Sequence, residues 1–174
     1  MPPAFPVVLK SHDPQWAGAA EREAERLRAA LGDTLVRVHH IGSTSIPGLV
    51  AKPILDLIPV ASSLAALDAA RGKLEELGYA WWGEFGLPGR RYCTLDDVGQ
   101  GRRLVQLHCY AEGSPEIARH LAFRDYLRGR PDVVAEYEAI KRRCAELHRE
   151  SSHAYGDCKG TWVKRIETEA LAEG

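Results

Sequence analysis

Apolar residues recur at helical spacing along the first part of the chain, between clear start and stop signals. Asp13 and Pro14 form an N-cap followed by a residue suited to a first helical turn, and Gly32 supplies a stop. The apolar face between them comprises Trp16, Ala20, Ala24, Leu27 and Leu31. This pattern predicts an amphipathic helix that packs one side against a core.

Four further helices are predicted downstream. One covers residues 64–77, where Ser63 provides the N-cap and Gly78 the left-handed stop. The other three are predicted to begin at Ser114-Pro115, at Pro131 and near Asp157.

In the helix that begins at Pro131, apolar residues fall on one side. The apolar set is Val133, Tyr137, Ile140, Cys144 and Leu147. The set expected to face water is Glu136, Lys141, Arg142 and Glu146.

Strand-like runs lie between the helices. They are Leu35–His39, Ile54–Val60, Tyr79–Trp82, Arg90–Leu95 and Arg102–Tyr110. The last two flank the turn sequence DDVGQG, which predicts an antiparallel hairpin. The connection from His39 to Ile54 is too short for a helical crossover, so these strands are expected to be antiparallel.

This order of elements predicts an α+β fold, in one domain over residues 1–174. About four to five strands form its sheet, helices flank the sheet, and the C-terminal part, about residues 114–172, is helical.

Composition and net charge exclude several classes of protein and of partner, but they do not change the predicted fold. The 174 residues are 45% hydrophobic and 27% charged, which excludes collagen-like and disordered classes. With 23 basic and 24 acidic residues the net charge is −1, so no general attraction to nucleic acid or an anionic membrane is expected. Neither nucleic acid nor a membrane is expected as a partner, a protein partner stays open, and any anion site must be local. With no signal peptide and no membrane-spanning run evident, a cytoplasmic location is expected.

The four cysteines are Cys93, Cys109, Cys144 and Cys158. They contain no CxxC pair that would indicate a zinc site. In a chain expected in the cytoplasm, they are predicted to be reduced, buried side chains rather than bridges or ligands.

The densest cluster of glycine and hydroxyl residues lies between two predicted strands, in residues 40–49. Gly42 allows the backbone to approach a ligand, and Ser43, Thr44 and Ser45 offer hydroxyl groups. Pro47 is suited to begin a helical turn whose free N–H groups attract an anion. The pattern fits a phosphate-binding turn, although an ordinary turn has the same composition.

Asp56 stands in the middle of an aliphatic strand. With a period of two, it shares a face with Ile54 and Ile58. A buried carboxylate requires a cation, a metal ion or N–H donors. The alternative to a ligand site is a structural salt bridge to Arg37, Arg91 or another arginine.

At this point the sequence resembles the GrpB family, small bacterial proteins assigned to the nucleotidyltransferase fold superfamily. The resemblance is carried in order by HHIGSTSIPGLVAKPILDL, LEELGY, QLHCY, HLAFRDYLR, YEAIK and AYGDCK, which together span almost the whole chain. It implies a nucleotidyltransferase-like mixed sheet.

The resemblance also implies a chemistry. Transferases of this fold have a Gly-Ser turn and, on the next strand, two carboxylates one residue apart that hold divalent metals. Gly42-Ser43 matches the turn and Asp56 the first carboxylate, but Ile58 replaces the second. A site for Mg, Mn or Zn is therefore expected on Asp56 and His108, unless His108 is only a hydrogen-bonded wall residue.

The implied catalytic residues are Ser43 on the phosphates, Asp56 on the metal, and His108 as ligand or general base. The remaining candidates for ligand binding are His40, Gly42, Thr44, Ser45, Lys52, Arg91, Arg124 and Lys159. Three alternatives stay open for this set. His39 and His40 point to opposite sides of a strand, so only one faces the cleft. Arg124 belongs to a row with His120 and Arg128 at intervals of four, which also fits a solvated or salt-bridged helix face. Lys159 also fits an ion pair with Asp56.

Two functions follow from these observations. The first is binding of a nucleotide or other phosphorylated small molecule, with metal-assisted nucleotidyl transfer if the site is active. The alternative is a non-catalytic auxiliary or partner-binding module, because the family is similar to domains fused to dephospho-CoA kinase. The segment GSTSIPGLVAK does not have the spacing of a kinase P-loop.

Overall fold

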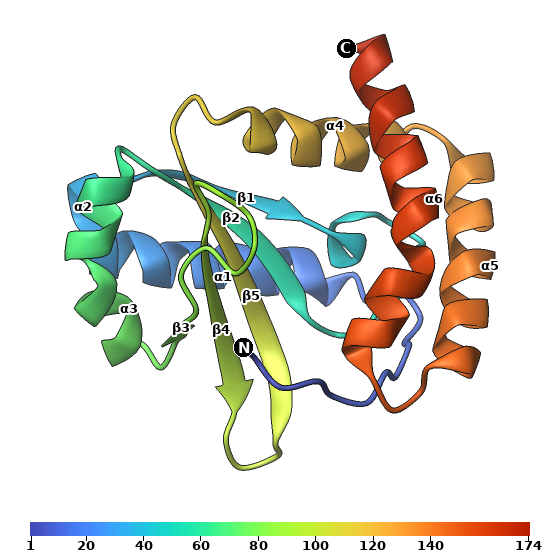
Figure 1. Cartoon of the computed structure of the whole chain (residues 1–174), viewed down its shortest axis with the longest axis horizontal. Helices are drawn as coiled ribbons and strands as arrows, with labels where there is room; N and C mark the ends of the chain where they lie inside the picture. The colour runs from blue at the N-terminus through green and yellow to red at the C-terminus, as the bar shows by residue number, and fades with distance from the viewer.

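A five-stranded mixed sheet forms the centre of the molecule in the computed structural model, which describes residues 1–174 (Figure 1). The strands are β1 (Leu35–Ile41), β2 (Leu55–Ala61), β3 (Ala80–Trp81), β4 (Arg91–Asp97) and β5 (Arg102–Ala111). Their spatial order is β1-β2-β5-β4-β3, and only β2 and β5 pair in parallel. The predicted α+β class, the antiparallel β1–β2 pair and the β4–β5 hairpin are confirmed.

Six α-helices surround this sheet. They are α1 (Gln15–Leu31), α2 (Leu64–Ala69), α3 (Arg71–Glu76), α4 (Pro115–Arg128), α5 (Pro131–Leu147) and α6 (Ser152–Glu173). Two short 3-10 turns, η1 (Gly32–Thr34) and η2 (Ser43–Ser45), precede and follow β1.

The two faces of the sheet bury different sets of residues. Helices α1 to α3 cover the face that carries Leu57 and Leu107, and the apolar side predicted for α1 is buried there. Ile58 points to the opposite face, where it packs with Ile41, Tyr110 and residues of α4. Figure 1 shows α5 and α6 side by side at the edge of this second face. Alternation along β2 therefore directs Asp56, like Ile58, toward the face with α4, α5 and α6.

The helix predicted over residues 64–77 is wrong as a single element, because the chain leaves helical geometry at Ala70. Leu67 before the break and Leu74 after it are both 1% exposed, so packing against the sheet sets the path of the chain here. The N-cap at Ser63 is confirmed, since its hydroxyl accepts a hydrogen bond from the Ala66 amide.

The start predicted for the last helix is also wrong. Helix α6 begins at Ser152, and Ser151 caps it by accepting a hydrogen bond from the Ala154 amide. Gly156 and Gly160 weaken the helical signal of its first turns.

Two residues of α5 depart from the predicted sides of that helix. Lys141 was expected in water but is 1% exposed, whereas Leu147 was expected in the core and is 63% exposed. Lys141 follows Tyr137 by four positions and precedes Cys144 by three, so it lies on the buried side with them. Leu147 is the last residue of α5, where the packing against α6 ends.

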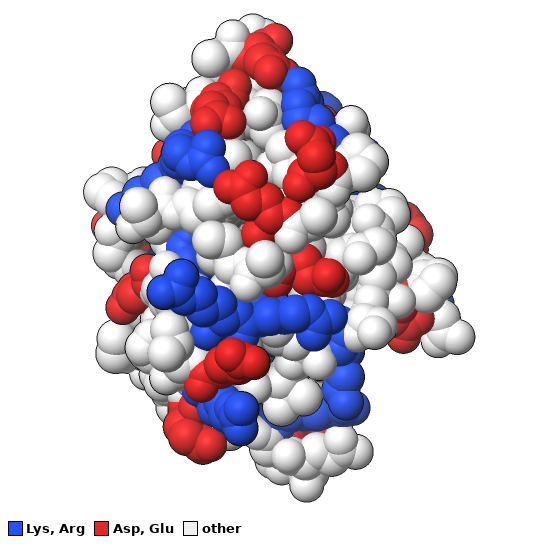
Figure 2. Space-filling model, turned by 90° about the vertical axis from the view of Figure 1, so that its right-hand side faces the viewer, with Lys and Arg blue, Asp and Glu red and all other residues white.

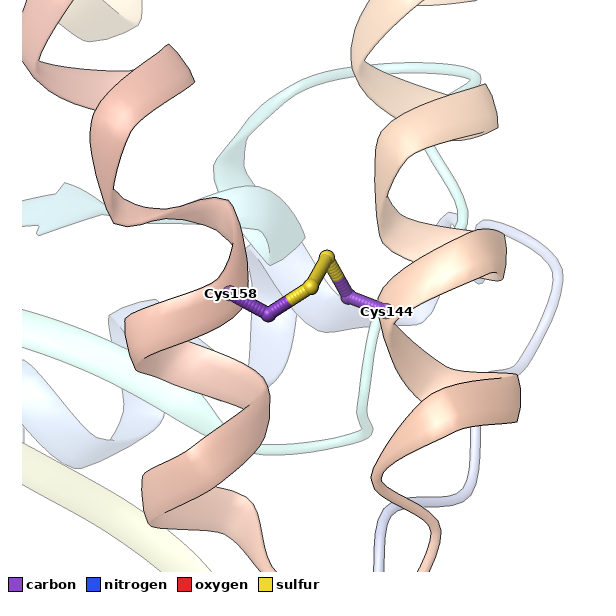
Figure 3. The surroundings of a disulfide bond; sticks show 2 residues. All are labelled: Cys144 and Cys158. Carbon is purple, nitrogen blue, oxygen red and sulfur yellow. A yellow bond between two sulfur atoms is a disulfide. The ribbon is translucent and has the colours of Figure 1, made fainter.

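A disulfide bond between Cys144 of α5 and Cys158 of α6 corrects the prediction of four reduced thiols (Figure 3). The two Cα atoms lie 5.8 Å apart because the helices pack side by side, which residue spacing alone does not reveal. Cys93 and Cys109 are free and buried, as predicted.

The helices lack any stretch that combines the length and the apolar character needed to cross a bilayer. Figure 2 shows acidic and basic side chains together on one face of the molecule, where a basic band has carboxylates above and below it. On this face, charges of opposite sign lie close enough to screen each other.

Candidate functional site

The turn that follows β1 packs directly on Asp56. Gly42 has a φ of 71°, and a Cβ at this position would lie 2.7 Å from Oδ2 of Asp56. The Ser45 hydroxyl donates to the Gly42 carbonyl oxygen at 2.6 Å and closes the turn. A glycine is therefore required for the turn and the carboxylate to approach each other this closely.

Helix α4 holds this turn from the other side. Arg124 donates through Nη1 to the His40 carbonyl oxygen at 3.1 Å, and Arg128 donates through Nε to the Ser45 carbonyl oxygen at 2.9 Å. Arg124 also forms a salt bridge with Asp125. Arg124, predicted to bind the ligand, instead holds the backbone at the end of β1, and Arg128 holds that of η2.

The turn after Ser45 differs from the prediction in one respect. Pro47 begins no helix, and the helical turn lies before it, at Ser43–Ser45. Three residues of 3-10 geometry do not make an N-terminal anion site, so the side chains must supply the binding groups.

Asp56 is held by an amide and an imidazole from β5. Its Oδ1 accepts a hydrogen bond from Nε2 of Gln106 at 2.8 Å, and Nε2 of His108 lies 3.0 Å from the same oxygen. Tyr92 and Arg103 both donate to Oε1 of Gln106, which fixes the amide with its NH₂ toward the carboxylate. No arginine or lysine forms a salt bridge with Asp56, so the structural alternative drawn from the sequence is wrong.

Burial and hydrogen bonding act on Asp56 in opposite directions. Burial would raise its pKa, but the hydrogen bonds from His108 and Gln106 and the charge of Lys52 hold that pKa below its usual value. The side chain keeps 23% of its surface exposed. Asp56 is therefore an ionised carboxylate with access to solvent.

A cavity of about 230 Å³ opens in front of Asp56, between the sheet, η2 and helices α5 and α6. Its lining consists of Ser43, Thr44, Lys52, Ile54, Asp56, Gln106, Lys141, Tyr155 and Lys159. Three lysines and one aspartate give this lining a net formal charge of +2, in a protein whose net charge is −1. Because the net charge of the protein is close to zero, any anion site was expected to be local. This cavity is such a local site, since its formal charge is positive.

Two of these lysines have pKa values well below normal. Burial lowers the pKa of Lys52 to about 8, and the charge of Lys159 adds to the effect. Burial also lowers the pKa of Lys141, with further contributions from Lys159 and Lys52. Lys141 has one hydrogen bond to a protein oxygen, from Nζ to the Val50 carbonyl at 2.6 Å. These shifts record the desolvation of the two ammonium groups and then the repulsion between them and Lys159. Burial opposes the charge of Lys159 as well, but its contacts with Tyr137 and Tyr155 raise the pKa of that lysine.

Aromatic rings separate the ammonium groups. The Tyr155 ring lies 5.2 Å from Nζ of Lys52 and 4.8 Å from Nζ of Lys159. The Tyr137 ring lies 5.1 Å from Nζ of Lys141 and 5.7 Å from Nζ of Lys159. Tyr155 is fully buried, and its hydroxyl has no hydrogen-bond partner in the protein.

The structure brings most of the predicted site residues together. Ser43, Thr44, Lys52, Asp56 and Lys159 line the cavity, and Gly42 and Ser45 shape the turn behind it.

The two histidines of the predicted site lie behind the cavity wall. His108 reaches Asp56 without lining the cavity. His40 is hydrogen-bonded to Oγ1 of Thr44 at 2.8 Å, and burial lowers its pKa to about 4. Both support residues that face the cavity.

Two predicted binding residues lie elsewhere, and one predicted ion pair does not form. Arg91 forms a two-pronged salt bridge with Asp68 of α2, and the Arg124 guanidinium donates to the His40 carbonyl oxygen of β1. Lys159 makes no ion pair with Asp56 and instead donates to the Tyr137 hydroxyl at 3.4 Å. Both arginine side chains are thus engaged by protein groups away from the cavity.

The residues around Asp56 do not fit the expected divalent metal. Ile58, at the place of the second carboxylate, is fully buried among Ile41, Val60 and Tyr110. Nowhere in the molecule do three or more His, Cys, Asp or Glu side chains gather as metal ligands. Mg²⁺ prefers several oxygen ligands. Here Oδ1 of the single carboxylate already accepts two hydrogen bonds, so the site offers too few ligands.

Lys141 is the charged residue of the cavity that the sequence analysis missed, and Gln106 and Tyr155 are further lining residues outside the predicted set. A lysine at a position that helical periodicity places beside Tyr137 and Cys144 was the available signal. A charged residue on an apolar face requires a partner inside the fold.

Comparison with protein families and curated proteins gives consistent matches. The family model described as "GrpB protein" matches residues 6–169. The UPF0157 protein YqkA of Bacillus subtilis is 38% identical over 168 residues, which cover 97% of this chain and 48% of that protein. The chain thus spans about half the length of that relative. A UPF0157 protein of Streptomyces coelicolor is 34% identical, with 98% of this chain and 88% of that protein covered.

One further relative has a named enzymatic activity. A dephospho-CoA kinase of Mycolicibacterium paratuberculosis is 30% identical over 184 aligned positions, which cover 91% of this chain and 44% of the kinase.

Two solved structures place the fold. The crystal structure of conserved protein GrpB from Enterococcus faecalis superposes with a TM-score of 0.89 at 37% identity, covering 95% of this chain and 98% of that one. Cid1 in complex with its short product ApU superposes with a TM-score of 0.54 at 14% identity, covering 78% of this chain and 42% of Cid1. The second likeness is one of fold alone, and it is nucleotidyltransferase-like.

Proposed function

The chain belongs to the GrpB family, and from this premise we propose that the cavity between η2, β2, α5 and α6 binds a nucleotide or another phosphorylated small molecule. The observation that carries the proposal is the convergence of Lys52, Lys141 and Lys159 on one hollow that holds a single carboxylate.

Energetics favour an anion in this hollow. A desolvated ammonium group is costly unless it meets an opposite charge or several acceptors. Lys141 is fully buried with one carbonyl partner, and Lys52 and Lys159 repel it and each other. A phosphate group would relieve this repulsion and accept charge-assisted hydrogen bonds.

The hydroxyl side of the cavity fits the same ligand. Ser43 and Thr44 stand on η2 opposite the helices that carry Lys141 and Lys159. A hydroxyl group donates one hydrogen bond, and phosphate oxygens accept several. We therefore place the phosphate between the hydroxyl groups of η2 and the ammonium groups of α5 and α6.

The proposal is for binding, and we derive no transfer step. Two-metal transfer requires paired carboxylates to hold the ions that stabilise the developing charge. Ile58 stands in the place of the second carboxylate, and Asp56 is engaged by Gln106 and His108.

The alternative function is that of an auxiliary module that kept the fold. It is favoured by the dephospho-CoA kinase of which the matching segment makes up less than half, and by the substitution at Ile58. The two functions differ in whether the cavity takes a ligand.

Isothermal calorimetry on the full chain distinguishes them. ATP, CTP, GTP, UTP and inorganic triphosphate are titrated with and without Mg²⁺, Mn²⁺ and Zn²⁺. We expect at least one phosphate compound to bind, and Lys52→Met to weaken that binding by at least about tenfold, because it removes one charged donor.

The matched control is Lys164→Met. Lys164 is an exposed lysine of α6 that does not line the cavity, so its replacement removes the same charge from the surface. If no phosphate compound binds, or if both variants lose affinity equally, the cavity is not a phosphate site and the auxiliary function is favoured.

A further inference from the structure

We infer that this cavity takes its phosphorylated ligand in the metal-free form, with lysine ammonium groups in the charge-neutralising role that divalent metals have in transferases of this fold. The inference rests on the proposed function and specifies the chemical state of the ligand: a phosphoanion with at least two negative charges and no bound Mg²⁺.

The acidic side of the cavity is too weak to recruit a metal. Asp56 is the one carboxylate of the lining, and its Oδ1 already accepts two hydrogen bonds. Its Oδ2 faces Gly42 so closely that a Cβ atom at position 42 would lie 2.7 Å from this oxygen. A hard divalent cation needs several free oxygen ligands, and this carboxylate does not provide them.

The basic side is correspondingly strong. Lys52 approaches from the segment before β2, Lys141 from α5 and Lys159 from α6, so the ammonium groups surround the hollow. With Asp56 included, the lining carries +2, and a divalent cation that enters meets net repulsion. The same field attracts a phosphoanion and favours the species with the most negative charge.

The ammonium groups are held in place without carboxylate partners. Tyr155 lies between Lys52 and Lys159, and Tyr137 lies between Lys159 and Lys141, at the ring distances given above. Cation–π contacts stabilise a charge without neutralising it. No protein carboxylate pairs with these lysines, and an anion in the cavity would favour their charged form.

Metal dependence of binding tests the inference. ATP and inorganic triphosphate are titrated into the full chain by calorimetry, first with EDTA and then with Mg²⁺ in excess over the ligand. We expect both to bind in EDTA and excess Mg²⁺ to weaken binding by at least about fivefold, because Mg²⁺ neutralises ligand charge that the lysines would meet. Titration of Mg²⁺ or Mn²⁺ alone is expected to give no binding.

Variants assign the effect to the lysines. Lys159→Met and Lys141→Met are each expected to reduce the affinity for metal-free triphosphate by at least about tenfold, whereas Lys164→Met leaves it unchanged. Because Lys141 is fully buried, circular dichroism must show that its variant is folded, and Lys159→Met gives the answer if it is not.

The outcomes separate the inference from the proposed function. Binding that requires Mg²⁺ or is strengthened by it would overturn the inference and leave the phosphate site in place. Absence of binding under both conditions would overturn both. Binding in EDTA that survives Lys159→Met would overturn the assignment to the lysines.

Discussion

Gly42 is the residue on which the geometry of the turn depends. It combines a left-handed φ with a contact in which an added Cβ would meet Oδ2 of Asp56 at 2.7 Å. Two separate penalties therefore apply to any side chain at this position, backbone strain and overlap with a carboxylate.

Gly42→Ala is expected to lower the free energy of unfolding by about 2–4 kcal/mol, measured by urea denaturation. Gly48→Ala is the matched control, because Gly48 has a φ of +82° but nothing within 4 Å of its Cβ position. The control should lose only about 1–2 kcal/mol from strain. Equal losses in the two variants would mean that the contact with Asp56 is unimportant.

At the scale of elements, the pair α5 and α6 carries two of the three lysines that line the cavity. Lys141 lies one turn before Cys144, and Tyr155 and Lys159 lie within one turn of Cys158. The disulfide therefore fixes the two helices to each other at the level of the cavity. The distance between α5 and α6 therefore decides how far Lys141, Tyr155 and Lys159 extend toward β2.

Reduction of the Cys144–Cys158 disulfide is expected to lower the free energy of unfolding by about 3 kcal/mol, since it frees a loop with a sequence separation of 14 in the unfolded chain. Urea denaturation with and without a thiol reductant measures this. In the double variant Cys144→Ser and Cys158→Ser, the reductant should have no effect, because Cys93 and Cys109 are already free. An unchanged wild-type midpoint would contradict the expectation.

At the scale of the whole molecule, charge is distributed unevenly between surface and interior. The face in Figure 2 mixes both signs, and the chain as a whole is close to neutral, yet the cavity is lined by three lysines and one aspartate. A protein with this distribution attracts anions over short distances only, and the cavity is a place where it does so.

Two partly buried histidines contribute to the acid stability of the molecule. Burial lowers the pKa of His40 to about 4 and of His120 to about 3, while both titrate near 6.5 when unfolded. Between these values the unfolded chain binds protons that the folded chain does not. Stability is therefore fully present above about pH 6.5 and falls as the pH drops toward 4, by about 3 kcal/mol in all after allowance for partial exposure.

Chemical denaturation between pH 4 and pH 7.5 tests this dependence. His40→Gln and His120→Gln, which do not titrate in this range, should each flatten the acid limb of the stability profile. His153→Gln is the control, since His153 is exposed. An acid limb that is the same in all three variants would contradict the role of the buried histidines.

Helices and strands with a strong local signal followed from the sequence alone. The buried side of α1 and the β4–β5 hairpin depend on periodicity and turn residues, which are local properties. The break at Ala70 and the start of α6 at Ser152 were not predictable in this way, because packing against the sheet and glycines within the helix overrode the local pattern.

The residues of the candidate site also fall into two groups, those that the sequence identified and those that only the fold brought together. The sequence by itself determined the turn with Gly42 and Ser43 and the mid-strand Asp56, because their residue types are unusual for the places where they stand. Only the tertiary structure decided that Lys141 faces them, that Arg91 and Arg124 do not, and that Cys144 meets Cys158. These facts depend on how α4, α5 and α6 pack on the sheet, and contacts between residues far apart in the chain leave no periodic trace in the sequence.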